Sequence, residues 1–300
     1  MFYHWLPIIL YSIHINSAIE KSNISEYNDE MRFRIIGGYF CSTIQYGFMV
    51  RVMGEKPNSG STTACGGTII KPRWVLTAAH CYSGSVTEYK IIAAANTNQL
   101  LIEVEHFHVH PNFNYSTVSS SANDVALLQL KTPLYENDVK FVKLLRSRDD
   151  PYCQTGLVMG WGHMENKTLN QKPTHAKITE LQCTLATLLP LNECKTRAGI
   201  YSELIKPYHI CILTTEIDVR PGDSGGPLLC GDVQVGIASF SGKQPFSSAV
   251  AVYTKVVDHL DFIDGVIDRT KLSRSHNEKL YQCSSLNIAI IIVIWCIGAV

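Results

Sequence analysis

Short apolar runs separated by turn-forming residues recur through the middle of this chain. Glycine, proline, asparagine and serine lie between the runs. Runs of this kind are typical of β-strands in an all-β domain. The pattern therefore predicts an all-β fold. The clearest runs are residues 90–94, 101–104, 125–130, 157–159 and 233–238.

A different spacing near the end of the chain predicts one helix. Apolar residues recur there at i, i+4, i+7 and i+11, which places them on one face of a helix. We expect them to form a single apolar stripe. The residues are Val256, Leu260, Ile263 and Ile267.

The first residues have the pattern of a secretory signal peptide. Residues 6–15 form a short apolar run, and Asn16-Ser17-Ala18 offers a small-residue cleavage site. No lysine or arginine precedes the run, which differs from the usual signal. We expect residues 1–18 to be a signal peptide.

The last residues form a second apolar run after a polar spacer. The spacer is residues 271–285, and residues 286–300 are apolar except for Asn287. Such a tail is shorter than the roughly 20 residues that span a bilayer as a helix. Three interpretations stay open: a glycolipid-anchor (GPI) signal whose tail is removed, a retained hydrophobic membrane anchor, and a soluble product.

Composition favours a globular protein of an oxidising compartment. The chain has 300 residues, 46% of them hydrophobic, and its formal net charge of zero argues against a nucleic-acid partner. Ten cysteines without a Cys-x-x-Cys pair favour disulfides and a secreted, extracellular location. Sequons mark Asn23, Asn114 and Asn166 as candidate glycosylation sites.

Candidate chemistry begins at Gly222-Asp223-Ser224-Gly225-Gly226-Pro227, where a serine stands between an acid and two glycines. Glycines let amide N–H groups converge beside the hydroxyl, but a serine nucleophile also needs a base and an orienting acid. His80 follows a strand-like run and adjoins Cys81, and Asp124 leads into another strand. A buried aspartate needs a donor, and an imidazole N–H fits. Taken one at a time, each motif has a simpler interpretation. The serine segment also fits a flexible linker, His80 a packed histidine, and Asp124 a surface cap.

The order His80, Asp124, Ser224 is that of the chymotrypsin-type triad, and the chain resembles the trypsin/chymotrypsin family of serine endopeptidases over roughly residues 35–267. The resemblance implies that Ser224 is the nucleophile, His80 the general base and then acid, and Asp124 the orienter of His80. The amides of Gly222 and Ser224 would form the oxyanion hole. Ser239 would lie on the strand that lines the substrate cleft.

The resemblance also implies the architecture. It consists of two six-stranded antiparallel β-barrels with the triad in the cleft between them, followed by a C-terminal helix. We expect the protease domain over residues 35–270 and the crossover between barrels near residues 140–155. We expect protein or peptide substrates, an activating protease and protein inhibitors as partners, and no cofactor.

Arg34-Ile35-Ile36-Gly37-Gly38 resembles the family's activation site. Cleavage after Arg34 would release residues 19–34 as a propeptide and create an ammonium group on Ile35. That group would pair with Asp223 and order the oxyanion hole. The simpler interpretation is a basic residue at the start of a strand.

Disulfide pairings follow from the resemblance, whereas Cys283 and Cys296 have no obvious partner. Cys153 lies slightly earlier than the family pattern places it. The implied pairs are Cys41–Cys183, Cys65–Cys81, Cys153–Cys230 and Cys194–Cys211.

The residue six positions before the nucleophile forms the floor of the specificity pocket in this family, and here it is Asp218. A carboxylate there predicts cleavage after arginine or lysine; the simpler interpretation is an exposed acid on a loop. Arg220 stands where a cysteine is usual, and Ser241 and Ala251 stand at wall positions that are usually glycine. Arg220 removes a disulfide from the pocket wall, and Ser241 and Ala251 narrow its entrance. A weakly active or non-catalytic homologue that acts by binding is therefore the alternative function.

A histidine-rich run at residues 105–110 raises a metal hypothesis. Alternate residues of a strand share a face, so His106, His108 and His110 would converge. A polar strand face explains the run equally simply, and the His110-Pro111 pair is typical of the family. We expect no metal there, and no calcium in the short loop between Tyr89 and Glu105.

Overall fold

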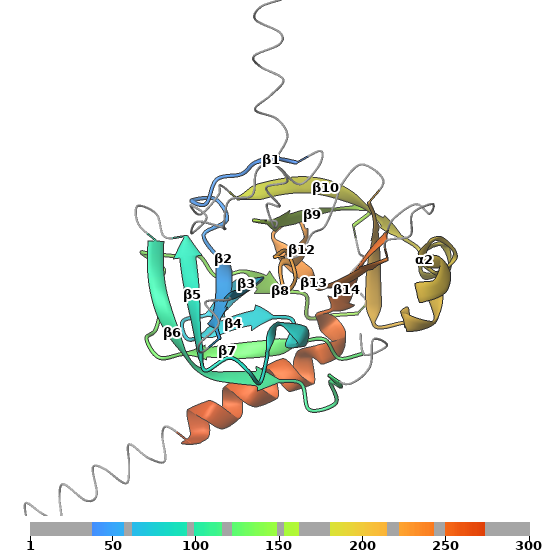
Figure 1. Cartoon of the computed structure of the whole chain (residues 1–300). Helices are drawn as coiled ribbons and strands as arrows, with labels where there is room; N and C mark the ends of the chain where they lie inside the picture. The colour runs from blue at the N-terminus through green and yellow to red at the C-terminus, as the bar shows by residue number, and fades with distance from the viewer. Residues whose placement is uncertain are drawn as a thin grey trace, which may run out of the picture.

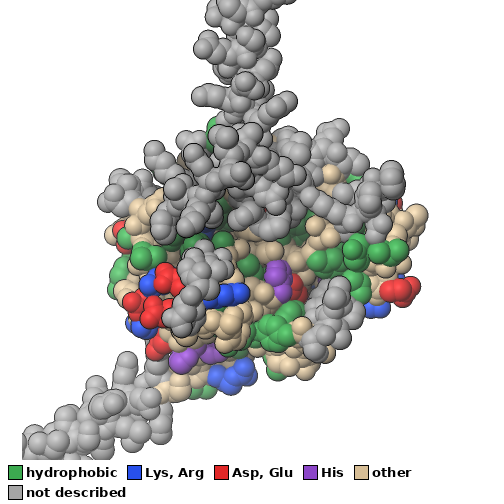
Figure 2. Space-filling model, in the orientation of Figure 1, with side chains coloured by type: hydrophobic (Ala, Val, Ile, Leu, Met, Phe, Trp, Pro, Cys, Tyr) green, Lys and Arg blue, Asp and Glu red, His purple; other side chains and the backbone are tan. Residues whose placement is uncertain are grey.

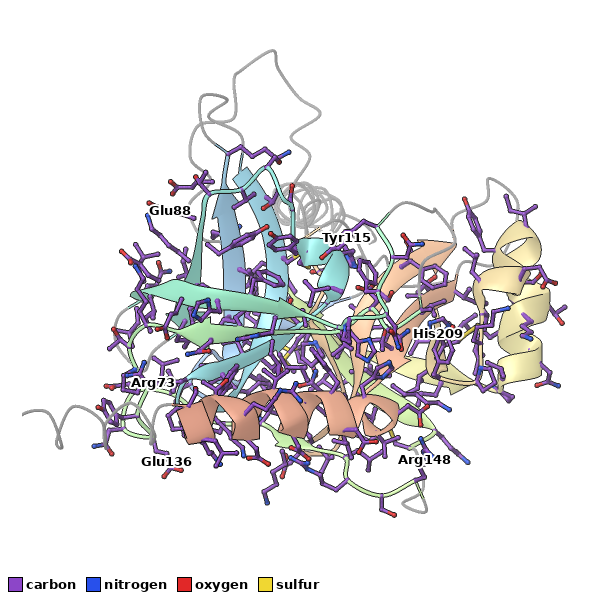
Figure 3. All side chains as sticks on the ribbon, turned by 90° about the horizontal axis from the view of Figure 1, so that it is seen from below. Arg73, Glu88, Tyr115, Glu136, Arg148 and His209 are labelled. Atoms are coloured by element: carbon purple, nitrogen blue, oxygen red, sulfur yellow. A yellow bond between two sulfur atoms is a disulfide. The ribbon has the colours of Figure 1, made fainter. Side chains whose placement is uncertain are left out.

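The computed structural model describes residues 38–56, 62–94, 99–115, 122–148, 153–161, 181–214, 222–242 and 250–273. Within these ranges two β-barrels stand side by side (Figure 1). Glu88 of the first barrel and His209 of the second lie towards opposite sides of the molecule (Figure 3). The activation site, both terminal segments, Asp218, Arg220, Asn23, Asn166, Cys283 and Cys296 lie outside the described residues.

The first barrel closes in the order β2-β3-β4-β7-β6-β5, and all of its neighbouring strands are antiparallel. Val50 and Val52 alternate with outward residues along β2, so their side chains point into the barrel core. The strands are β2 (Met49–Glu55), β3 (Thr62–Lys71), β4 (Trp74–Thr77), β5 (Glu88–Ala94), β6 (Gln99–Val109) and β7 (Ala126–Leu130).

The second barrel closes because β9 pairs with both β10 and β12, giving the ring β9-β10-β11-β14-β13-β12. Two short strands lie outside the ring: β1 (Tyr39–Phe40) on β10, and β8 (Lys143–Leu144), which pairs with β13 in parallel. The strands of the second barrel are β9 (Thr155–Gly160), β10 (Gln182–Leu189), β11 (His209–Leu213), β12 (Pro227–Cys230), β13 (Val233–Gly242) and β14 (Val250–Lys255).

Helical segments complete the fold. Residues 260–273 form a helix that follows η3 (Val257–His259) and runs back beneath the first barrel (Figures 1 and 3). Val256, Ile263 and Ile267 of the predicted stripe are fully buried, and Leu260 is partly buried. Two barrels and a C-terminal helix confirm the predicted fold class. The other helical elements are η1 (Ala79–Cys81), α2 (Leu191–Ala198) and η2 (Gly199–Leu204).

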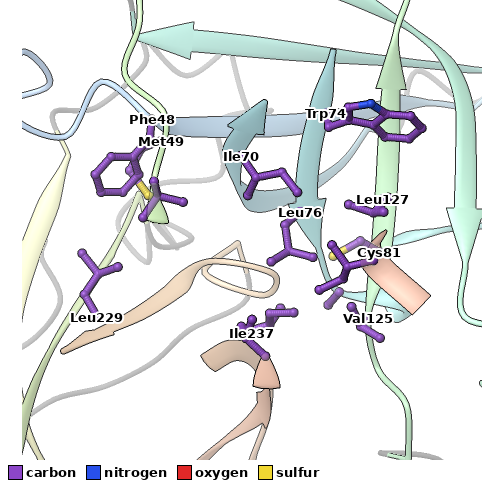
Figure 4. Close-up of a cluster of buried hydrophobic side chains, with 14 of the residues drawn as sticks. Phe48, Met49, Ile70, Trp74, Leu76, Cys81, Val125, Leu127, Leu229 and Ile237 are labelled. Atoms are coloured by element: carbon purple, nitrogen blue, oxygen red, sulfur yellow. The ribbon is translucent and has the colours of Figure 1, made fainter. Parts of the chain in front are cut away.

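The two barrels share an apolar core at their interface. Met49 and Leu76 from the first barrel pack in one cluster with Leu229 and Ile237 from the second (Figure 4). One polar link crosses the same interface, where the Thr68 hydroxyl donates to the side-chain oxygen of Gln234 at 2.7 Å. Because buried apolar area drives association, this core fixes the barrels relative to each other.

Four disulfides are present in the described residues, and they are the pairs implied by the family resemblance. Cys65–Cys81 joins β3 to η1, the short helix that carries His80. A loop of this length contributes about 3 kcal/mol by restricting the unfolded chain. The others are Cys41–Cys183, Cys153–Cys230 and Cys194–Cys211.

No helix in the described ranges has the length and apolar character required to cross a bilayer.

Candidate active site

His80 and Asp124 meet at the edge of the first barrel. Nδ1 of His80 lies 2.7 Å from Oδ2 of Asp124, and the backbone N–H of His80 donates to Oδ1 at 2.9 Å. A carboxylate only accepts, so Nδ1 carries the hydrogen and Nε2 is left to act as a base. Asp124 is 2% exposed, whereas the His80 side chain is 34% exposed. The imidazole thus connects a buried charge to the surface.

A strained turn aims the Asp124 side chain. Asn123 has a φ of 57°, the one positive value at a non-glycine residue in the described segments. The amide of Val125 donates to the carbonyl of Asn123 at 2.8 Å, so the chain reverses tightly before β7. Asparagine tolerates this left-handed conformation better than most residues. The turn holds Asp124 inward, although it immediately precedes a buried strand.

Ser239 reaches Asp124 from the second barrel. Its hydroxyl donates to Oδ2 of Asp124 at 2.5 Å. Ser239 lies at a register shift between Ala238 and Phe240, where β13 bulges against β14. A bulge of this kind redirects one side chain out of the regular alternation. The bulge explains how Ser239, a strand residue of the second barrel, can donate a hydrogen bond to Asp124 of the first barrel.

These contacts set opposite pKa shifts on the pair. Burial would raise the pKa of Asp124, but the charge of His80 and hydrogen bonds from His80 and Ser239 outweigh it and lower the pKa. Burial would lower the pKa of His80, but attraction and hydrogen bonding to Asp124 raise it. Asp124 therefore stays ionised, and His80 becomes a better proton acceptor.

The loop that carries Ser224 is fixed by both barrels. The amide of Gly66 in β3 donates to the carbonyl of Ser224 at 2.7 Å, and the amide of Gly225 donates to the carbonyl of Ala238 at 2.8 Å. Thr77 donates to the carbonyl of Gly66 at 2.8 Å, so the strand before His80 joins the same network. Serine loop, base and acid are thus tied to a common frame.

Two amides of the serine loop are left for a ligand. In the described residues, the N–H groups of Gly222 and Ser224 donate to no other group, whereas those of Gly225 and Gly226 each bond a carbonyl. Gly222 has a φ of 103°, a conformation that favours glycine. An unpaired backbone N–H is uncommon, and a pair beside a serine suits a developing oxyanion.

Comparison with known proteins identifies the family. The trypsin family model matches residues 35–263. The chain belongs to the trypsin family of serine endopeptidases. Within this family Kallikrein-2 from Homo sapiens is 32% identical over 250 residues, covering 78% of this chain and 90% of the relative. Trypsin from Sus scrofa is 32% identical over 241 residues, covering 78% and 96%. This confirms the resemblance inferred from the motifs.

A solved structure supports the same fold. The structure of HL collagenase matches with a TM-score of 0.63 at 21% identity, covering 78% of this chain and 99% of the other. Its likeness at this identity concerns the fold. Family membership and the disulfides together indicate an extracellular protein.

Two of the residues predicted to line the specificity pocket of this trypsin-family chain lie in the described ranges. Ser241 and Ala251 lie directly opposite each other on β13 and β14, so their side chains share one face of the sheet. Ser241 is exposed and Ala251 is buried. The predicted pocket floor, Asp218, and its neighbour Arg220 lie outside the described residues.

The histidine run does not form one cluster. His106 and His108 lie in β6 with ring centroids 5.8 Å apart, and His108 contacts Gln129. His110 follows the strand and packs instead on His259 and Phe262. A different group, Cys65, His80 and Cys81, brings ligand atoms within 4.8 Å of one another. Both sulfurs form a disulfide, so neither is a thiolate for a metal.

Sequence reasoning missed the supporting residues. Gly160 lies against Asp223, and a Cβ at Gly160 would overlap Oδ1 of the Asp223 carboxylate. A Cβ at Gly66 would lie 3.2 Å from the backbone of Gly226. Glycine thus leaves room at Gly160 for the Asp223 carboxylate, and at Gly66 it avoids a crowded contact with the serine loop. The Gly-Gly pair after Cys65 was the available signal, but the partner loop lies far away in sequence.

Proposed function

We propose that this protein is a secreted serine endopeptidase that is made as a zymogen, activated by cleavage after Arg34, and hydrolyses peptide bonds after arginine or lysine. The observation that supports the chemistry best is the buried Asp124 carboxylate, which accepts from His80 and from Ser239 at the cleft. A carboxylate held this way orients an imidazole and stabilises its protonated form.

Acylation uses the three residues in succession. Nε2 of His80 takes the proton from the Ser224 hydroxyl as the serine oxygen attacks the carbonyl carbon of the scissile bond. The carbonyl oxygen gains the negative charge and accepts hydrogen bonds from the amides of Gly222 and Ser224. His80 then gives its proton to the leaving amine, the carbon–nitrogen bond breaks, and an acyl-enzyme remains.

Deacylation repeats the steps with water. His80 takes a proton from water, whose oxygen attacks the acyl carbon, and returns that proton to Ser224 as the ester bond breaks. Asp124 keeps its charge throughout, which agrees with its lowered pKa. The raised pKa of His80 matches a base that must hold the proton during both attacks.

Activation centres on Asp223. Its side chain is 5% exposed, it adjoins Ser224, and its carboxylate lies against Gly160 of β9. Cleavage after Arg34 would give Ile35 an ammonium group able to pair with this buried carboxylate. The pairing would fix the loop from Gly222 to Ser224 and so complete the oxyanion hole.

Specificity is assigned to Asp218, because a carboxylate at the pocket floor attracts the side chains of arginine and lysine. Ser241 and Ala251 add volume at the pocket wall relative to glycine, which narrows the entrance. Arg220 replaces a cysteine, so the pocket lacks the wall disulfide usual in trypsins. Cleavage after basic residues, at reduced efficiency, is the expected outcome.

Secretion rests on the signal pattern of residues 1–18 and on the disulfides. The exposed Asn114 is available as a glycan acceptor. Anchoring through residues 286–300, by a glycolipid or by the tail itself, is the proposed membrane association. Protein substrates and protein inhibitors are the expected partners, together with a protease that cleaves after Arg34.

Substrate profiling after controlled cleavage tests this proposal. The purified precursor is treated with an immobilised protease that cleaves after basic residues, and a new N-terminus at Ile35 is verified by sequencing. We expect fluorogenic peptides with arginine or lysine before the scissile bond to be cleaved faster than those with phenylalanine or leucine. The reverse order would reject the assignment of Asp218. No cleavage of any peptide by folded, processed protein would favour the non-catalytic binding homologue.

A further inference from the structure

An arginine lies on the outer face of the first barrel, on the side on which the Ser224 loop packs. Val50 and Val52 of β2 point into the barrel, so Arg51 between them points to the opposite face. Arg51 pairs in register with Gly66 of β3 on one side and Ile92 of β5 on the other. Residues directly opposite each other in an antiparallel sheet share a face.

Gly66 connects this face to the nucleophile. Its amide donates to the carbonyl of Ser224 at 2.7 Å, and the Cβ that it lacks would lie 3.2 Å from Gly226 and 3.7 Å from the carbonyl oxygen of Asp223. Arg51 is one strand away, about 5 Å between Cα atoms. Arg51 therefore belongs to the sheet face on which the serine loop packs, one strand from the point of contact.

No described residue neutralises the charge of Arg51. Across the residues that the structure describes, the guanidinium of Arg51 forms no hydrogen bond and no ion pair. Burial lowers the pKa of its guanidinium, and no acidic group offsets this. Asp223 belongs to the nearby serine loop, but its carboxylate faces Gly160, and it is its backbone carbonyl that faces Gly66. A half-buried cation without a partner is costly, which favours binding of an anionic group.

Other cations on this face are already paired. Lys90 of β5 lies 3.5 Å from Glu88 and 3.9 Å from Glu55. Lys131 pairs with Glu103 of β6. Figure 2 shows acidic and basic side chains intermixed on the side of the barrel where β5 and β6 lie. Within the described part of the chain, Arg51 thus differs from Lys90 and Lys131 in having no acidic partner.

Apolar side chains continue the row beyond Arg51. Ile92 is opposite Arg51, and Leu101 of β6 is opposite Ile92. Leu101 is 64% exposed. The row Gly66–Arg51–Ile92–Leu101 therefore leads from the serine loop to a cation and then to apolar surface. A free inorganic anion would use only the cation, whereas a polypeptide with an acidic and an apolar side chain uses the whole row.

We propose that Arg51 anchors a secondary binding site for the carboxylate of an aspartate or glutamate in a protein substrate, with Ile92 and Leu101 contacting an apolar side chain beside it. The inference rests on the proposed endopeptidase function, because the substrate must also occupy the Ser224 site. It adds a preference for acidic residues outside the primary pocket, where the preference is for basic ones.

Matched peptides test this site on the activated protein. Quenched fluorogenic peptides of equal length share one arginine at the scissile bond and carry glutamate, glutamine or lysine at each of the first four following positions. The readout is the ratio of kcat/KM for the glutamate peptide over the glutamine peptide, so a general loss of activity cancels. We expect a ratio of about ten at one or two positions, the size of a charged hydrogen bond.

Variants of Arg51 assign that preference. Arg51→Gln should bring the ratio to about one, and Arg51→Glu should reverse it in favour of lysine. Lys90→Gln is the matched control, a cation of the same face that is already paired, and it should keep the ratio of the wild type. Thermal melts verify that each variant is folded.

Several outcomes would overturn the proposal. These are a wild-type ratio near one at all four positions, a ratio that survives in Arg51→Gln and Arg51→Glu, and an equal change in Lys90→Gln. If the wild type cleaves no peptide, the endopeptidase proposal fails by itself. Binding of labelled glutamate and glutamine peptides to Ser224→Ala protein, with and without Arg51→Gln, then tests separately whether Arg51 binds the acidic side chain.

Discussion

The hydroxyl of Ser239 donates to Oδ2 of Asp124, the oxygen that also faces Nδ1 of His80. Asp124 belongs to the first barrel and Ser239 to the second, so this hydrogen bond joins the two barrels. The position of the acid consequently depends on how the two barrels dock. A substitution at the barrel interface is therefore expected to shift His80 even when the substituted residue does not contact His80.

Removing this hydroxyl should weaken catalysis while leaving the fold intact. In Ser239→Ala the buried carboxylate loses one of its three donors, so its pKa rises and its hold on His80 loosens. We expect kcat/KM to fall about tenfold, the value of a hydrogen bond to a charged group. Ser239→Thr keeps a hydroxyl and should retain more activity. Equal activities for alanine and wild type would show that Ser239 does not position Asp124.

The pH dependence should report the His80–Asp124 pair. Because Asp124 raises the pKa of His80, the acid limb of kcat/KM should lie above the ordinary histidine value of 6.5. In Asp124→Asn that attraction is lost, so the limb should move to lower pH while kcat falls about 10⁴-fold. An acid limb that stays in place would contradict the coupling.

The same pair should affect stability in a defined pH window. The raised pKa of His80 gives stability that is present below 6.5 and lost as pH rises through the folded value. The lowered pKa of Asp124 gives stability that is present above 3.8 and lost as pH falls through the folded value. The difference in Tm between wild type and Asp124→Asn should therefore be largest between about pH 4 and 6.5. A difference that grows above pH 8 would have the wrong sign.

Gly225 should be one of the least replaceable residues of the serine loop. Its φ is 80°, and a Cβ there would overlap the Thr77 hydroxyl and lie 2.5 Å from the carbonyl of Gly66. We expect Gly225→Ala to lower the free energy of unfolding by about 3 kcal/mol or more, from conformation and crowding together. Gly231→Ala is the control, since its φ is 58° but its surroundings are open, and it should lose only about 1 kcal/mol.

Gly160 should matter for activity more than for folding. A Cβ there would displace the Asp223 carboxylate, which is proposed to receive the new terminus of Ile35. We expect processed Gly160→Ala to lose about 10²-fold in kcat, the effect of losing an oxyanion donor. Gly84→Ala, where nothing lies within 4 Å, should behave as wild type. Wild-type turnover in processed Gly160→Ala would show that the position of the Asp223 carboxylate does not control activation.

The local sequence pattern was enough to predict the strands whose apolar runs are continuous. It underestimated the length of strands that have one solvent-exposed face. The run at residues 101–104 is part of β6, which extends over Gln99–Val109. Glu103 and Glu105 face outward, so an apolar run could not reveal their strand. Closure of each barrel joins strands far apart in sequence, and the family resemblance rather than the pattern predicted it.

The candidate site shows the same division. His80, Asp124 and Ser224 could be predicted as catalytic residues because each lies in a short motif with a chemical reason. The hydrogen bond from Ser239 could not be predicted, because it depends on a bulge in β13 that has no local signature. Arg51 also reads as an ordinary strand residue, because its lack of a partner is a property of the folded neighbourhood.

Labelling with a fluorophosphonate before and after cleavage at Arg34 tests the central claim most directly. The account predicts that folded precursor is labelled slowly or not at all, and that processed protein starting at Ile35 is labelled rapidly at Ser224. Labelling should be lost in Ser224→Ala and His80→Ala. Correctly processed, folded protein that stays unlabelled at Ser224, or precursor labelled as fast as processed protein, would contradict a triad controlled by the new terminus.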